Sequence, residues 1–498
     1  DFGSGTTASS RAALVVANVQ TNTGAPLPGN DFSTQLLAST TSNGDVRASV
    51  QNLVGGALNV NDSSVTASAT GNAAVGVISA AGNRAALDAS SALTSVQVNT
   101  LAPVQSSNMN SDIVATIGTG LTNSPVNVNG SLQQASATGN QGAQTLSLSA
   151  TDLHVKGTAG SLDTGVHSNY IHLDAFNVGA LVTSAQTSVQ SSTTALTSAA
   201  NVLLDASHTT ANVTGSALSA TGGTQDAIAL GGSAANNLTL SATTLSGNAG
   251  LVNAQGTDAS SPTSANVSAS SVQLLAGNSG ANVVGSPLTV SGNLQRAIAY
   301  GATASNTVNI GANTANVPAS GGTASNVSLN LFGHPYVEAQ YGLLNDQSTQ
   351  SSVTAGVNAS ATPSFGISVG ANLDGTSATN DGNAVLAVGY GNQAANGMTL
   401  AVNTLVVPTP GYANVASVTN AQKVGDDANV SASSVSGAAL VRTTVAGGVT
   451  QASVTASGNE VQTLAYGNRA NSNTLAVTAT SLSSVKTTGS VLTGSLNS

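Results

Sequence analysis

Residues 457–482, SGNEVQTLAYGNRANSNTLAVTATSL, contain the pattern that decides the fold of this chain. Gly458-Asn459 and Gly467-Asn468 are two Gly-Asn pairs nine residues apart, and an alternating run at 474–480 follows them. Gly and Asn adopt positive φ at low cost, so each pair predicts a turn between short apolar runs. The period-two run predicts a strand with one buried face. Turns at this spacing predict strands of roughly five to seven residues in a narrow, coiled all-β structure.

The same stretch recurs along the chain in six degenerate copies, roughly seventy to ninety residues apart. Three further copies keep the nine-residue step between glycines: Gly222 and Gly231, Gly292 and Gly301, and Gly382 and Gly391, the last followed by Asn392. The copies that start at Ser68 and Ser136 are looser, and the second of them has lost its second pair. Repetition at this period predicts an array of similar units.

The composition favours a thin core built from small side chains. Charged residues make up 6% of the chain, against about a quarter in a typical domain. Aromatic residues make up 2%, and Trp and Cys are absent. However, 40% of the residues are hydrophobic, mainly Ala, Val and Leu, which disfavours a disordered chain.

These features predict a parallel β-helix or β-solenoid, in which coils stack about 4.8 Å apart and like side chains lie over like. Asn side chains at repeated corners are expected to form hydrogen-bonded ladders between coils. With about twenty residues per coil, we expect twenty-odd coils and a rod ~100 Å long. A string of β-sandwich modules is the alternative, but such modules usually carry aromatic anchors, and most copies here have one Tyr or none.

Departures from the repeat divide the chain into four segments. Residues 1–50 are interpreted as an N-terminal cap or attachment segment, and residues 51–330 as a solenoid array with an excursion at 151–176. Residues 331–369 are interpreted as an aromatic-bearing insertion, and residues 370–498 as further array with a C-terminal edge. That edge, like the N-terminal run LVVANVQ, has few charges and no Pro, so we expect β-strand pairing at one end, with a second copy or with a partner.

No catalytic, cofactor or metal site is predicted. His167, His172 and Asp174 suggest a metal, but on a strand the first would point away from the other two, so a solvated polar loop is favoured. His334 and Glu338 could form an acid–base pair, yet no nucleophile or second carboxylate accompanies them.

The segment 331–347 is instead interpreted as a cover for the rod or a partner-docking site. The candidate docking residues are Phe332, His334, Tyr336 and Tyr341. Aromatic side chains are scarce elsewhere in the chain and are favoured in interfaces.

The formal net charge of −10 and the pI of about 4.5 argue against nucleic acid as a partner. No run of some twenty apolar residues is present, so no transmembrane helix is predicted. The first residues show neither an initiator Met nor a signal sequence, as expected of a mature, processed chain.

The units AYGNRANSNTL, from Ala465, and VGYGNQAANGMTL, from Val388, resemble the curlin repeat of secreted functional amyloids. Five residues match that repeat in order: Ser457, Gln462, Gly467, Asn468 and Ala470. The step from Gln462 to Gly467 is longer than in curlin, and Leu475 stands where the closing Gln would be.

Length, low charge and richness in Ala, Ser, Thr, Val and Asn are similar to the large holdfast-anchor adhesins of stalked bacteria. This resemblance implies a cell-surface location associated with the outer membrane, export through an outer-membrane pore protein, and a curlin-like small subunit as partner. It also implies attachment of adhesive polysaccharide by a non-enzymatic protein. A self-assembling fibre or surface-lattice subunit is the alternative. A polysaccharide-cleaving β-helix enzyme is less favoured, because the nine Lys and Arg residues are scattered singly.

Overall fold

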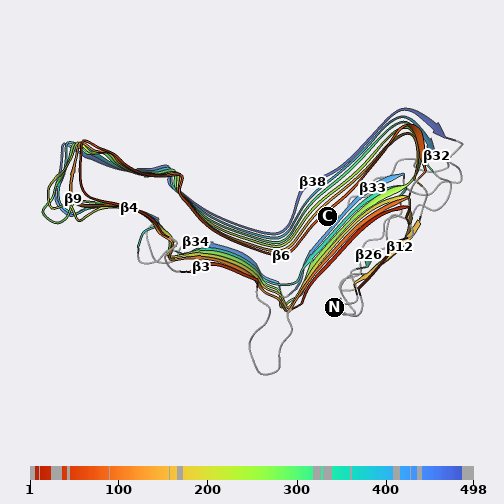
Figure 1. Cartoon of the computed structure of the whole chain (residues 1–498), viewed down its shortest axis with the longest axis horizontal. Coiled ribbons are helices and arrows are strands. Elements are labelled where there is room, and N and C mark those ends of the chain that lie inside the picture. Colours follow the sequence, from red (N-terminus) through yellow and green to blue (C-terminus); the bar gives the residue numbers. More distant parts are fainter. Residues whose placement is uncertain are drawn as a thin grey trace, which may run out of the picture.

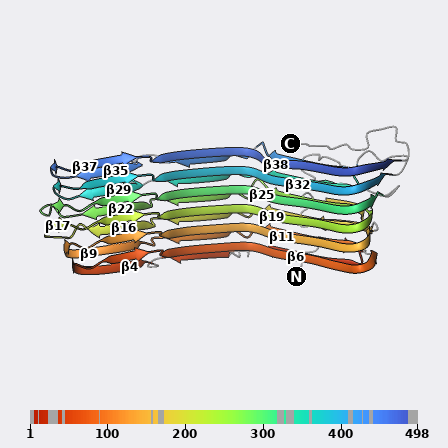
Figure 2. The ribbon, with the colours of Figure 1, turned by 90° about the horizontal axis from the view of Figure 1, so that it is seen from above.

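The chain forms a β-solenoid of six large coils, seen in the computed structural model as six stacked layers (Figures 1 and 2). The residues that the structure describes are 6–10, 12–23, 36–41, 45–88, 90–155, 158–164, 172–317, 327–328, 339–358, 362–407, 415–426, 428–434 and 440–484. Every element in these ranges is a strand. We number the coils 1 to 6 along the chain: 14–88, 91–155, 180–247, 249–316, 341–407 and 416–484.

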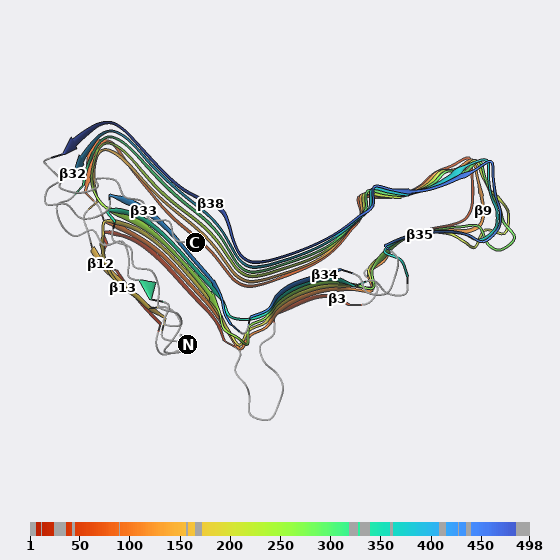
Figure 3. The ribbon, with the colours of Figure 1, turned by 180° about the vertical axis from the view of Figure 1, so that it is seen from behind.

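Each coil contributes one strand to a sheet of long strands. This long-strand sheet consists of β6 (Ser64–Asp88), β11 (Leu132–Val155), β19 (Thr224–Gly247), β25 (Leu294–Asn316), β32 (Ala384–Val407) and β38 (Glu460–Ser484). The strands pair in parallel, coil on coil. Part-way along, they bend together, and Figures 1 and 3 show that the outer side of the sheet lies on the inside of this bend.

Opposite the long strands, two further parallel sheets close the wider part of the coil. The β2 sheet consists of β2 (Leu14–Thr23), β7 (Ser91–Thr100), β14 (Ala180–Val189), β20 (Ala249–Thr257), β27 (Tyr341–Thr349) and β33 (Ala416–Val424). The β3 sheet consists of β3 (Leu36–Thr41), β8 (Val104–Met109), β15 (Thr193–Ser198), β21 (Thr263–Ser268), β28 (Val353–Asn358) and β34 (Val430–Ser434).

Two more sheets form the narrow end of the coil. The β4 sheet consists of β4 (Val46–Val54), β9 (Ile113–Thr122), β16 (Asn201–Ala206), β22 (Ser271–Ala276), β29 (Phe365–Val369) and β35 (Val441–Val445), with the short strands β17 (Val213–Thr214), β23 (Val283–Val284), β30 (Leu373–Asp374) and β36 (Val449–Thr450). The β5 sheet consists of β5 (Leu58–Asn61), β10 (Val126–Asn129), β18 (Leu218–Thr221), β24 (Leu288–Ser291), β31 (Ser377–Asp381) and β37 (Ser453–Ser457).

The predicted coil of about twenty residues is wrong, because one sequence repeat is one whole coil. Paired residues in neighbouring coils lie 66 (Ala86 and Asp152) to 93 (Val272 and Phe365) positions apart. Six coils with five steps of ~4.8 Å place the two end coils about 24 Å apart. The structure is therefore wide and short rather than a rod ~100 Å long.

The core is thin and filled by small side chains in columns, as the composition predicted. Side chains alternate between core and surface along the strands, as in the pattern BiBiBi of β8 and β15. Ala135, Ala227, Ala297 and Ala387 face one another in successive coils and are all completely buried. Leu, Val and Ile fill the wider parts of the coil in the same manner.

The segment boundaries differ from the prediction in two places. Residues 14–23, 36–41 and 46–54 pair in parallel with coil 2, so most of the described part of 1–50 belongs to the first coil and not to a cap. Residues 341–358 and 365–369 likewise form β27, β28 and β29 of coil 5, so they are not an insertion.

The excursion at 151–176 departs from the array from residue 158 on. β12 (Thr158–Thr164) and β13 (His172–Val178) pair antiparallel with each other, and with β1 (Thr6–Ser10) and β26 (Val327–Ser328) they form a separate four-stranded sheet. Figures 1 and 3 show this sheet on the outer side of the β2 sheet. In the β2 sheet, β14 and β27 are buried on both faces.

Candidate functional site

In the four copies with the nine-residue step, the first glycine forms a turn, as expected; in the copies at Ser68 and Ser136 the first glycine, Gly71 or Gly139, does not. Gly222, Gly292, Gly382 and Gly458 have φ between 60° and 65° and connect the β5 sheet to the long strands. Gly130 and Asp62 take the same place in coils 2 and 1, with φ of 66° and 51°. The Asn after each of the last two glycines builds a ladder: Asn383 donates to the Oδ1 of Asn459 at 3.0 Å.

The second glycine of each pair does not form a turn, so that prediction is wrong. Gly231, Gly301, Gly391 and Gly467 lie inside long strands, without positive φ, and their column continues through Gly139 and Gly71. In each coil but the last, a Cβ on this glycine would lie 2.4–2.5 Å from the carbonyl oxygen of the glycine in the following coil. Glycine is needed there because the backbones of neighbouring coils approach closely.

The predicted docking residues do not form a described surface. Phe332, His334 and Tyr336 lie outside the described residues, as does Glu338. Tyr341 is completely buried in the apolar core beside Leu343, so it is not a docking residue. Burial raises the pKa of its phenol well above the usual range. His167 also lies outside the described residues, and of His172 and Asp174 only the backbone in β13 is described.

Asparagines form ladders between coils, as the sequence predicted, but the longer ladders lie within strands and not at the predicted corners. Asn236, Asn306, Asn396 and Asn473 are joined in order by Nδ2–Oδ1 hydrogen bonds of 2.8 Å. Asn253, Asn345 and Asn420 are joined in the same way at 2.7 Å. Asn392 and Asn468, which follow the second glycines, are joined at 2.8 Å.

A longer ladder of glutamines crosses all six coils, and the sequence analysis missed it. Its members are Gln20, Gln97, Gln186, Gln255, Gln347 and Gln422. From Gln97 onward, the Nε2 of each glutamine donates to the Oε1 of the glutamine in the preceding coil, at 2.7–3.1 Å. The same Nε2 donates to a backbone carbonyl of the long strand opposite, as Gln255 does to Thr303 at 3.0 Å. The ladder therefore ties the β2 sheet to the long-strand sheet in every coil.

The outer side of the long strands carries a tyrosine column, which we define as Tyr300, Tyr390 and Tyr466. Ala297 and Ala299 point into the core, so the alternation of the strand places Tyr300 outside. The ring centroids are 4.8 Å and 5.0 Å apart with interplanar angles of 5° and 7°. Burial raises the pKa of Tyr300, with a further contribution from Tyr390.

Arg469 completes this column. Its Nη1 donates to the hydroxyl of Tyr390 at 2.6 Å, and its Cζ lies 5.5 Å and 5.3 Å from the ring centroids of Tyr390 and Tyr466. Arg469 follows Gly467 in β38, whereas the tyrosines precede the glycine of their strands, so the cation reaches back over the glycine toward the rings. A guanidinium close to aromatic rings and hydroxyl groups suits hydrogen bonding to a polar, hydroxyl-rich ligand.

Apolar and polar rows flank the tyrosine column on the same outer side. Ile228, Ile298, Val388 and Leu464 face one another two residues earlier in the strands. Two residues before those, Arg296 forms a bidentate pair with Asp226, at 3.0 Å and 2.6 Å. On the C-terminal side of the glycine column, Thr239, Asn309 and Thr399 form a row of hydrogen-bonding side chains.

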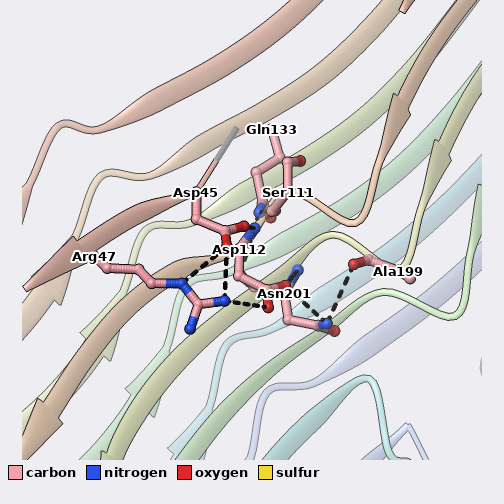
Figure 4. A network of polar contacts seen from close by, with 7 residues as sticks. All are labelled: Asp45, Arg47, Ser111, Asp112, Gln133, Ala199 and Asn201. Atoms are coloured by element: carbon pink, nitrogen blue, oxygen red, sulfur yellow. Dashed lines mark hydrogen bonds and ion pairs between the residues drawn. The ribbon is translucent and has the colours of Figure 1, made fainter. Parts of the chain in front are cut away.

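A second polar network joins coils 1, 2 and 3 at the β4 sheet (Figure 4). Asp45 pairs with Arg47 at 2.7 Å and accepts the backbone N–H of Asp112 at 2.8 Å. Asp112 in turn accepts from the backbone and side-chain nitrogens of Asn201, both at 3.1 Å. The Asp112 N–H, with smaller help from Arg47, holds the pKa of Asp45 below its usual value against the opposing effect of burial.

This network predicts a loss of stability in acid. Because the folded pKa of Asp45 is lowered, its stabilisation is present above the unfolded value of about 3.9 and is lost as the pH falls through the folded value. We expect Asp45→Asn, which can still accept the Asp112 N–H, to lower the urea midpoint at pH 7. The gap between variant and wild type should narrow progressively as the pH falls below the unfolded value of Asp45; a gap of constant size would contradict this account.

Among the described residues, no group of three or more His, Asp or Glu side chains could hold a metal ion. The same ranges contain no apolar helix of membrane-spanning length. Comparison with known proteins finds no match among family models, curated proteins or solved structures. The site is therefore interpreted from its own chemistry.

Proposed function

We propose that this chain is a secreted, non-enzymatic cell-surface adhesin that anchors adhesive polysaccharide to the cell envelope. The tyrosine column with Arg469, on the outer side of the long strands, is the observation that carries this proposal. Its hydroxyl groups, the guanidinium and the adjoining rows of Thr and Asn can each hydrogen-bond a hydrated sugar polymer. Because the rows repeat from coil to coil, many weak contacts act together, which gives avidity without a deep pocket.

The ladders support the same proposal from the mechanical side. Coils are joined by parallel backbone pairing in five sheets and by the side-chain ladders of Gln and Asn. Pulling two coils apart must break these hydrogen bonds together, so an anchor of this kind resists load. In the holdfast-like system that the sequence resembles, a curlin-like small subunit and an outer-membrane pore protein would be the partners.

Replacing Tyr300, Tyr390 and Tyr466 together by Leu tests the proposal. Leu230 already occupies this column in coil 3, so the triple variant is expected to keep the fold. We expect its binding to a hydroxyl-rich adhesive polysaccharide, measured by co-sedimentation, to fall at least tenfold. Tyr341→Phe removes a buried hydroxyl that has no hydrogen-bond partner among the described residues and is the matched control. Equal binding by both variants would overturn the proposed site, and release of reducing ends by the wild type would overturn the non-enzymatic function.

A further inference from the structure

Both end coils present an open strand edge. The five sheets of the array begin with strands of coil 1 and end with strands of coil 6, such as β2 and β33 or β6 and β38. Within the described ranges, one edge of each end strand therefore has no strand partner. Val75 and Val54 in coil 1 are 78% and 65% exposed, and Val449, Val454 and Val461 in coil 6 are 46–48% exposed. Unpaired edges with apolar side chains are templates for pairing with another chain.

Gly467 indicates what pairs with the coil-6 edge. A Cβ on Gly391 would lie 2.4 Å from the carbonyl oxygen of Gly467, which explains the glycine in coil 5. On Gly467 itself, the nearest atom to an added Cβ is the Cγ2 of Val424 at 3.8 Å, and its φ is not positive. Nothing described within one copy therefore requires glycine at 467. A further coil, with its own glycine carbonyl at this place, would require it.

Coil 1 of a second copy has the residues that such a further coil requires, and they lie in the matching register. Following the strand pairs from coil to coil, Gly467 corresponds to Gly71 and Asn468 to Asn72. In the β2 sheet, Gln422 corresponds to Gln20. Coil 1 of a second copy can thus continue three features beyond coil 6: the glycine column, the ladder that contains Asn392 and Asn468, and the glutamine ladder.

The hydrogen-bonding ends of the ladders also match. Gln422 donates to Gln347 at 2.7 Å, which leaves its Oε1 at the open end of the ladder. Gln20 donates one N–H to the carbonyl of Ala73 at 2.7 Å, which leaves a second N–H for an acceptor. A coil-1 edge against a coil-1 edge would instead set amide N–H groups against each other.

We propose that the coil-6 edge of one copy binds the coil-1 edge of a second copy in the register that continues the solenoid. Gly467 then lies against Gly71 of the next copy, and Gln20 of that copy donates to Gln422. Because this contact uses two different surfaces, it does not close on itself, and copies add head to tail into a filament. Tyr466 and Arg469 lie in β38 beside this contact, so assembly is measured without polysaccharide and with all three tyrosines in place, which keeps a failure of this proposal distinguishable from a failure of the proposed function.

Gly467→Ala is the first test, with wild-type chain at 1–100 µM followed by light scattering and electron microscopy. The wild type is expected to form filaments above a threshold concentration. The added methyl group should leave the thermal unfolding of the monomer unchanged and raise that threshold at least about tenfold, because it meets the carbonyl of the next copy. Gly311→Ala, at a strand glycine with no atom within 4 Å of the added Cβ, is the matched control and should assemble like the wild type.

A cysteine pair tests direction and register, since the chain has no Cys of its own. Thr66 and Gln462 correspond in coils 1 and 6, are exposed, and are separated by four intervening coils within one copy. Adjacent parallel strands place their Cα atoms within disulfide range. On oxidation, the double variant Thr66→Cys/Gln462→Cys should give a ladder of covalent multimers, and each single variant should remain monomeric on non-reducing gels.

Two results would overturn the proposal. One is a wild type that stays monomeric at 100 µM, including one that assembles only when another protein is added. The other is a covalent dimer formed by either single cysteine variant, which would show pairing of like ends.

Discussion

Gly301→Val is expected to lower the free energy of unfolding by about 3 kcal/mol or more, near the upper end for single substitutions. An added Cβ would lie 2.5 Å from the carbonyl oxygen of Gly391 and 2.6 Å from the Oγ1 of Thr349. One of these groups is backbone and the other belongs to a buried strand, so neither can move without breaking the stack of coils 4 and 5. Urea unfolding followed by circular dichroism, with limited proteolysis of the central coils, measures the effect.

Gly311→Val in the same strand, β25, is the matched control. A Cβ at Gly311 has no neighbour within 4 Å, its φ is not positive, and valine suits a strand. This variant should unfold within about 0.5 kcal/mol of the wild type. If the two valine variants proved equally stable, close packing of the glycine column would not be the reason for the glycines.

Gln255→Leu is expected to cost about 3 kcal/mol, because it removes the centre of the glutamine ladder. Gln255 is buried, donates to Gln186 at 2.7 Å and to the carbonyl of Thr303 at 3.0 Å, and accepts from Gln347 at 2.7 Å. Leucine removes the partner of three buried groups: the Oε1 of Gln186, the carbonyl of Thr303 and the Nε2 of Gln347. Each unsatisfied group is expected to lower the free energy of unfolding by roughly 1 kcal/mol or more.

Gln422→Leu provides the comparison at the end of the same ladder. Gln422 is partly exposed and donates to Gln347 at 2.7 Å, so water can replace much of what is lost. We expect about 1 kcal/mol or less for this change. A larger loss at Gln422 than at Gln255, measured by urea midpoints on monomeric protein, would contradict the role assigned to the ladder.

The fold class and the first turn of each repeat could be predicted from the sequence, because both depend on local signals. Gly222, Gly292, Gly382 and Gly458 precede apolar runs and adopt the positive φ that their residue type allows. The Asn ladders followed from the recurrence of Asn at one place in the repeat. The six sequence copies correspond to the six coils. In the copies at Ser68 and Ser136, however, Gly71 and Gly139 occupy the place of the second glycine and not of the turn glycine.

The length of the coil could not be predicted, because Gly467 and its equivalents have the same neighbours as a turn glycine. What distinguishes them is a carbonyl in the next coil, about seventy to ninety residues away, which no local pattern contains. The glutamine ladder was missed for a similar reason: its members are 69–92 positions apart and lie outside the Gly-Asn stretch. Tyr300, Tyr390 and Tyr466 each precede a second glycine in the sequence, but only the register between coils shows that their rings stack.

The distance along the chain between paired residues also determines how this protein can fold. The first pairing joins residues 66 or more positions apart, so a large loop must close before any hydrogen bond between coils forms. Once two coils have paired, their edge is a template, and each later coil adds to it at lower entropic cost. Folding is therefore expected to have a slow nucleation step followed by faster growth, coil by coil, along one axis. A chain that emerges from its N-terminus would lay down its nucleus first and extend it in the order of synthesis or export.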